Sequence, residues 1–243
     1  MQAETVGWHQ ESGMDASSGA RIAVENSGKG NTSFTLPKAE HSETGVSVEY
    51  VQDPNKAWLV LRASYGRCHK AADMLIGAGH YCYIAQRYEM VERDGRRHRE
   101  LKDLIPNLLF AYMNVSEAET LLSKSQSRPS PMPALAVITT FYYDHFSTVG
   151  GKNPPLEIPV DKMLHFIRMT MSKDANIVFT DKEQIVHVKR DDLVKVTDGL
   201  FAGCIGQVVH IAGQQRVGIK LRDIGWVATS YVPTAFLKVI ASA

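Results

Sequence analysis

Histidine and cysteine are the residues with the widest catalytic and metal-binding chemistry, and this 243-residue sequence contains nine and three of them. The histidines are scattered, with no HExxH motif and no carboxylate at ligand spacing. Cys68, Cys82 and Cys204 show no CxxC spacing, so they indicate neither a zinc site nor a disulfide framework, and they fit a reducing cytosol. The neighbours Cys68 and His69 fall on a predicted helix and point roughly 100° apart, which excludes a nucleophile–base pair. We expect no enzyme, no cofactor and no metal.

Arginine is the second residue type of interest, because four arginines fall within seven residues. They are Arg93, Arg96, Arg97 and Arg99, and Asp94-Gly95 between them predicts the turn of a β-hairpin. An exposed basic hairpin can contact phosphates, each contact adding salt-dependent affinity without sequence preference. A solvated, charge-rich loop is the alternative, and the sequence leaves both open.

Composition and charge restrict the class of protein. The hydrophobic fraction is 44%, the charged fraction 22% and the net charge +1, which is typical of a globular protein and excludes a generally basic nucleic-acid coat. Residues 1–56 carry four Lys/Arg against eight Asp/Glu, a net of −4, so an acidic leader precedes two mildly basic segments. No secretory signal and no apolar run of ~20 residues is found, so we expect a soluble cytoplasmic protein.

The segment 57–172 predicts one α+β domain in which helices pack on an antiparallel-rich sheet. Apolar residues at helical spacing predict helices over 68–76 and 160–167, and Ser116 with Glu119 predicts a capped short helix. Strands are expected over 58–64, 80–92, 104–113 and 134–143.

The flanking segments differ from this domain. Residues 1–56 are rich in Ser, Gly, Glu and Thr, so we expect them to be largely disordered, with at most a short strand near 46–51. Residues 173–190 are expected to form a partly ordered linker. Residues 191–243 contain five short β-branched runs at regular spacing, which predict a small β-barrel.

The barrel segment contains the sequence VKVTDGLFAGCIGQVVHI. Gly199 and Gly203 bracket a turn that needs positive φ, Phe201 fills the barrel mouth, and Gly206 permits close backbone approach before Val208. This pattern resembles a KOW motif, the bent hairpin of an SH3-like barrel found in NusG-type factors and several ribosomal proteins.

Three further stretches make the resemblance more specific. WLVLRASYGRCHKAADML and LIPNLLFAYM resemble the NusG N-terminal domain, and IAGQQRVGIKLRDIGWVATSYVP is similar to the UpxY-like paralogues, antiterminators of capsular polysaccharide operons. The resemblance covers residues 57–243. The insertion at 142–155 and the acidic leader favour a specialised factor over a housekeeping one.

The resemblance implies a transcription elongation or antitermination factor that binds the clamp helices of RNA polymerase and catalyses nothing. The implied polymerase-binding residues are Arg62, Tyr65, Ile105, Pro106 and Leu108, and the alternative for Ile105 and Leu108 is that they are ordinary core residues of a strand. The arginine hairpin would lie near the DNA of the elongation complex. Ser116, Glu117 and Glu119 would reach the other side of the polymerase channel.

In the same family the KOW barrel recruits a further factor, which this sequence does not identify. We expect a monomer that does not bind membranes.

One alternative is a ribosome-associated or RNA-binding KOW protein. It predicts a stronger basic balance than the net +2 of residues 173–243, where nine Lys/Arg face seven Asp/Glu. An enzyme with an unrecognised site is the other alternative.

Overall fold

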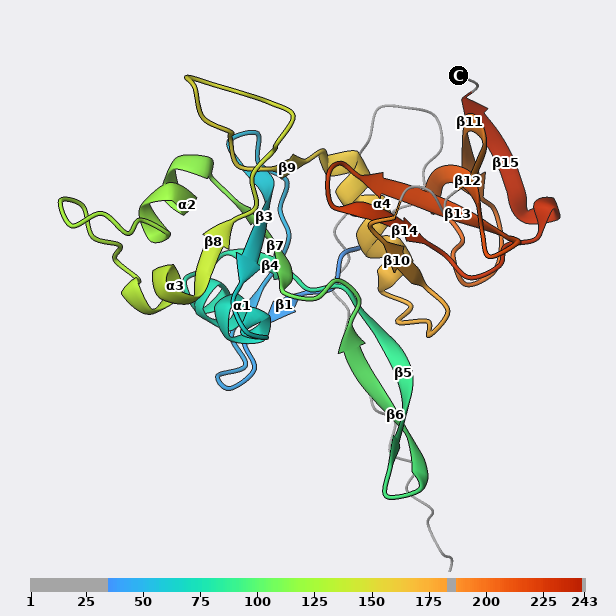
Figure 1. Ribbon diagram of the computed structural model, residues 1–243, viewed down its shortest axis with the longest axis horizontal. Helices are drawn as coiled ribbons and strands as arrows, with labels where there is room; N and C mark the ends of the chain where they lie inside the picture. The colour runs from blue at the N-terminus through green and yellow to red at the C-terminus, as the bar shows by residue number, and fades with distance from the viewer. Residues whose placement is uncertain (1–34, 183–186, 242–243) are drawn as a thin grey trace, which may run out of the picture. The chain divides into compact units, whose positions relative to one another are not determined.

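The computed structural model describes residues 35–182 and 187–241. The described strand pairs are antiparallel, and the sheets are accompanied by a few short helices, as Figure 1 shows. The predicted α+β class is therefore confirmed. No helix in the described part of the chain combines the length and apolar character that crossing a membrane requires.

The first sheet has the strand order β4-β7-β3-β8, and β9 also pairs with β3. Its strands are β3 (Ala57–Ala63), β4 (Tyr81–Tyr83), β7 (Leu108–Met113), β8 (Thr139–Phe141) and β9 (Glu157–Ile158). Its helices are α1 (Cys68–Gly77), α2 (Val115–Leu121), α3 (Pro133–Ile138) and α4 (Val160–Thr170). The helical spacing predicted for α1 is confirmed, because its periodic residues Cys68, Ala71, Ala72, Leu75 and Ile76 are all buried.

The segment 134–143, predicted as one strand, is divided between a helix and a strand. Pro133 occupies the first turn of α3, where its missing N–H has no intrahelical partner to lose. Ala134, Leu135 and Ala136 then have high helix propensity, so the chain becomes extended only from Thr139. The strand prediction was wrong for the first five residues because their apolar run fits a buried helix as well as a strand.

Residues 36–56 belong to the folded domain, which corrects the expectation of a disordered leader for this part of it. Strands β1 (Ala39–Glu40) and β2 (Ser47–Val48) form a small antiparallel pair. Tyr50 is buried and stacks on Trp58, with ring centroids 5.6 Å apart, and the Tyr112 hydroxyl donates a 2.8 Å hydrogen bond to the Asp53 carbonyl. These few anchors follow no period, so the sequence pattern did not reveal them. Residues 1–34 lie outside the described residues.

A second sheet, the C-terminal sheet, has the strand order β10-β14-β13-β12-β11-β15. Its strands are β10 (Val178–Thr180), β11 (His187–Val196), β12 (Ile205–Ile211), β13 (Gln214–Leu221), β14 (Gly225–Ala228) and β15 (Leu237–Ala241). Val209, Ile211, Trp226 and Ala228 form part of its core, and Val178 packs against them. β10 therefore extends this sheet with residues from the segment predicted as a linker.

Strands β5 (Gln86–Arg93) and β6 (Arg96–Asp103) pair only with each other among the described strands. They form a two-stranded ribbon that projects from the first sheet in Figure 1. The register Arg93↔Arg96 leaves Asp94 and Gly95 as the turn, with φ values of 53° and 71°. Positive φ at both central residues is the requirement of the tight hairpin turn, so the Asp94-Gly95 prediction is confirmed.

Candidate functional site

The arginines of the β5–β6 ribbon are held in different ways. Arg93 forms an ion pair with Glu100 at 2.9 Å, and the Arg99 guanidinium lies 3.8 Å from the centroid of the Tyr88 ring. Arg96 and Arg97 are exposed and pair through their backbones with β5, but neither side chain has an ion-pair or hydrogen-bond partner within the described part of the chain. Two of the four guanidinium groups are thus fully available to an external anion.

Glu100 partly neutralises the ribbon. Its carboxylate accepts a hydrogen bond from Lys102, and this bond, followed by the charge of Arg93, holds the pKa of Glu100 below its ordinary value. An ionised Glu100 therefore pairs with Arg93 and Lys102 on the same ribbon. Positive charge without a carboxylate partner remains at the tip, at Arg96 and Arg97.

The implied polymerase-binding residues do not share one exposed surface. Ile105 and Leu108 are 4% and 5% exposed, so the expectation that they contact a partner is wrong for these two residues. Leu108 begins β7, which lies between β4 and β3 and is buried at all six positions. A central strand that is covered on both faces has no solvent-facing residues. β7 therefore lacks the alternation of buried and exposed side chains that would leave one of its faces open to a partner.

Tyr65, Pro106 and Arg62 are exposed, and the first two lie in loops that are hydrogen-bonded together. The Asn107 side chain accepts a 3.0 Å hydrogen bond from the Gly66 N–H, and its backbone carbonyl accepts another from Ala63. Tyr65 is 91% exposed and has a φ of 53°. A left-handed conformation is uncommon for a bulky residue, so the loop holds this aromatic ring outward at a conformational cost.

Val137 is a further exposed apolar residue, on a helix whose end is hydrogen-bonded to the Tyr65 loop, and the sequence analysis missed it. It is 73% exposed on α3, and the neighbouring Ile138 carbonyl accepts a 2.8 Å hydrogen bond from the Ser64 N–H, one residue before Tyr65. We name Arg62, Tyr65, Pro106 and Val137 the Tyr65 surface. The sequence could not place Val137 outward, because it assigned that segment to a strand.

The loop 142–156 carries a second exposed aromatic residue, Phe146, at 87% exposure. The loop is anchored by Asp144, whose buried carboxylate accepts hydrogen bonds from Phe146 N and Ser147 Oγ and pairs with Arg222 at 3.0 Å. The hydrogen bonds from Ser147 and Phe146 lower the pKa of Asp144. The sequence identified this insertion, but nothing in it distinguishes Phe146 from its aromatic neighbours.

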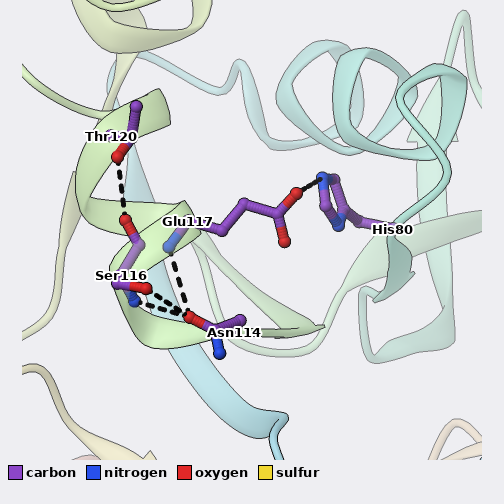
Figure 2. A network of polar contacts seen from close by, with 5 residues as sticks. All are labelled: His80, Asn114, Ser116, Glu117 and Thr120. Carbon is purple, nitrogen blue, oxygen red and sulfur yellow. Dashed lines mark hydrogen bonds and ion pairs between the residues drawn. The ribbon is translucent and has the colours of Figure 1, made fainter.

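The helix after β7 begins one residue before its predicted cap. Figure 2 shows that Asn114, not Ser116, caps α2: its side-chain oxygen accepts hydrogen bonds from the N–H groups of Ser116 at 2.9 Å and Glu117 at 3.4 Å. Glu117 is thereby directed toward His80, 3.6 Å away. Glu117 is half-exposed and Glu119 is exposed, while Ser116 is partly used within the cap.

The residues of the KOW-like pattern lie in the turn between β11 and β12 and at the start of β12. Gly199 and Gly203 have φ values of 81° and 85°, and Phe201 between them is buried. A Cβ atom on Gly206 would stand 2.5 Å from the Gly218 carbonyl oxygen, so the close approach of β12 and β13 requires glycine there. Val208 is half-buried and lines a cavity of about 320 Å³ on the C-terminal sheet.

The three cysteines are buried, and this limits their chemistry. Burial raises the pKa of the Cys68 thiol to about 11 and that of Cys204 to about 12, so both are poor nucleophiles at neutral pH. Within residues 35–182 and 187–241, no three His, Cys, Asp or Glu side chains are grouped so as to hold a metal ion.

No protein-family model matches the chain, and no curated protein sequence matches it significantly.

Proposed function

We propose that this chain is a NusG-type transcription elongation or antitermination factor that acts in the cytoplasm as a monomer. It docks on the clamp helices of RNA polymerase through the Tyr65 surface and serves polysaccharide operons. The sequence resemblance supplies the family. The conformation of Tyr65 is the structural observation that carries the proposal.

Tyr65 has the properties of an interface anchor. Aromatic side chains contribute a large share of the energy at protein interfaces, and they bind best when they are held in place before contact. Tyr65 is 91% exposed, and two hydrogen bonds to Asn107 hold the backbone on either side of it, at Ala63 and Gly66. The exposed residues Pro106 and Val137 add apolar area, and Arg62 adds a positive charge.

The ribbon supplies the nucleic-acid contact in this proposal. Arg96 and Arg97 stand unpaired at its tip, where they can bind the DNA phosphates of the elongation complex. Arg93 and Arg99 are already engaged by Glu100 and Tyr88, and they hold the ribbon in shape. The C-terminal sheet is left to recruit a further partner.

The proposed mechanism is a shift of population. A factor that binds the closed clamp of the polymerase better than the open clamp favours the closed state by the difference in binding free energy. The closed clamp keeps the nucleic acids in register, which suppresses pausing and termination. No covalent step and no cofactor are needed.

Retention of purified RNA polymerase core on the immobilised chain tests this proposal. We expect retention at moderate salt and its loss in the variant Tyr65→Ala. Tyr231→Ala is the matched control, because Tyr231 is an exposed tyrosine on the C-terminal segment. Retention of ribosomes instead of polymerase would support the ribosome-associated KOW protein.

A further inference from the structure

The connection between the first sheet and the C-terminal sheet is short and extensively hydrogen-bonded. Only residues 171–177 join α4 to β10. Within them, Asp174 accepts hydrogen bonds from Asn176 N at 2.8 Å and, through its backbone carbonyl, from Ile177 N at 3.2 Å. Ile177 is completely buried. We name residues 173–177 the junction.

The root of the ribbon is attached to the junction at two points. The Tyr88 N–H donates a 3.0 Å hydrogen bond to the Lys173 carbonyl, and Arg87 Nη1 donates one of 2.7 Å to the Ile177 carbonyl. On the other edge of the same guanidinium, Nη2 donates a 2.6 Å hydrogen bond to Glu89 Oε1. Arg87 is thus fixed in the orientation that reaches the junction.

The C-terminal sheet is attached to the same five residues. Arg216 on β13 is buried, and its Nη1 donates to the carbonyls of Asn176 at 2.8 Å and Thr229 at 2.7 Å. The Ser230 hydroxyl donates a 3.2 Å hydrogen bond to the Asp174 side chain. A buried charged donor that bridges two backbone carbonyls is costly to displace, because both acceptors would then lack a partner.

We propose that the junction is a rigid connector rather than a flexible tether, with Arg87 and Arg216 as the positioning residues that hold the arginine ribbon and the C-terminal sheet in one fixed relation. The ribbon and the C-terminal sheet are both hydrogen-bonded to the same five junction residues. Displacing either element breaks hydrogen bonds to that backbone. The functional consequence rests on the proposed function: phosphates bound at Arg96 and Arg97 and a partner bound to the C-terminal sheet would be held in a fixed position relative to each other.

A distance measurement on the isolated full-length chain tests the rigidity without polymerase or nucleic acid. Nitroxide labels are placed at Glu92→Cys on the ribbon and Lys238→Cys on β15, two exposed positions. The native cysteines Cys68, Cys82 and Cys204 are buried and compete poorly for the label. Double electron–electron resonance then gives the distribution of distances between the two labels.

The parent protein should give one narrow distance peak. The Arg87→Ala variant should give a broad distribution instead, while its near-ultraviolet circular dichroism spectrum stays native. Lys102→Ala is the matched control and should keep the narrow peak, because Lys102 is the cross-strand neighbour of Arg87 but pairs with Glu100. Arg87→Gln replaces Arg87→Ala if the latter does not fold. A broad distribution in the parent, or an unchanged narrow peak in both Arg87 variants, overturns the proposal. Neither result bears on polymerase binding.

Discussion

His80 Nε2 lies 3.6 Å from Glu117 Oε1, and the His80 side chain is 8% exposed whereas that of Glu117 is 48% exposed. The contact joins the loop after α1 to the first turn of α2. Burial lowers the pKa of His80, the negative charge of Glu117 opposes this, and Lys56 adds to the lowering. His80 is consequently neutral at neutral pH, and the contact becomes an ion pair only on protonation.

This arrangement predicts a loss of stability on acidification. The unfolded chain takes up a proton at His80 near the ordinary pKa of about 6.5, whereas the folded chain takes it up only at lower pH. Below about pH 6.5 the unfolded state therefore binds more protons, and the free energy of unfolding decreases as the pH falls. Urea unfolding between about pH 7.5 and pH 5 should show this decrease, and His80→Gln should reduce it.

Glu117→Gln provides the control for the direction of the effect. Removing the carboxylate removes the charge that raises the pKa of His80, so an NMR titration should place this pKa lower than in the parent chain. A decrease of stability that is identical in the parent and in His80→Gln would show that other groups are responsible. His165 is the first of these to test, because burial also lowers its pKa.

Ile105→Glu should unfold the first domain rather than affect binding alone. Ile105 is 4% exposed, and a carboxylate placed there would lose its hydration. We expect a destabilisation of about 3 kcal/mol or more, measured by urea unfolding. Pro106→Glu, at the exposed next position, should cost little. An Ile105→Glu variant as stable as the parent would contradict the burial of this side chain.

Arg96 and Arg97 should account for much of the salt dependence of DNA binding. Each phosphate contact contributes about 0.9 to the slope of log affinity against log salt, so Arg96→Ala with Arg97→Ala should reduce the slope by about 2. The binding of a mixed-sequence DNA duplex at several salt concentrations measures it. The control variant, Arg93→Ala with Lys102→Ala, also removes two positive charges, but both of these side chains already pair with Glu100. Its effect on the salt slope should therefore be smaller. A slope that Arg96→Ala with Arg97→Ala leaves unchanged would assign the tip to a solvated loop.

Local patterns in the sequence predicted the elements whose determinants are themselves local. The helical spacing of Cys68, Ala71 and Leu75 gave α1, and Asp94-Gly95 gave the ribbon turn. Gly199 and Gly203 have the positive φ that their turn required. Each of these features depends on a few consecutive residues, so no knowledge of distant neighbours was needed.

Features that depend on distant neighbours were not predicted. The sequence left Leu108 open between a partner contact and the core, and only the strands on both sides of β7 and the cover on both of its faces decide for the core. Tyr50 lies in a polar segment and becomes part of the core only because Trp58, Tyr81 and Tyr112 surround it. The junction likewise consists of backbone carbonyls, which have no sequence signature. The candidate polymerase surface was therefore predicted at Arg62, Tyr65 and Pro106 and missed at Val137.

The affinity of the full-length chain for purified RNA polymerase core tests the central claim most directly. The measurement is a fluorescence titration of the parent chain, Tyr65→Ala and the control Tyr231→Ala. Loss of a preorganised aromatic anchor typically costs 2 kcal/mol or more, so Tyr65→Ala should bind about thirtyfold more weakly while Tyr231→Ala matches the parent. Equal affinity of all three proteins, or no binding by the parent, would contradict docking through the Tyr65 surface.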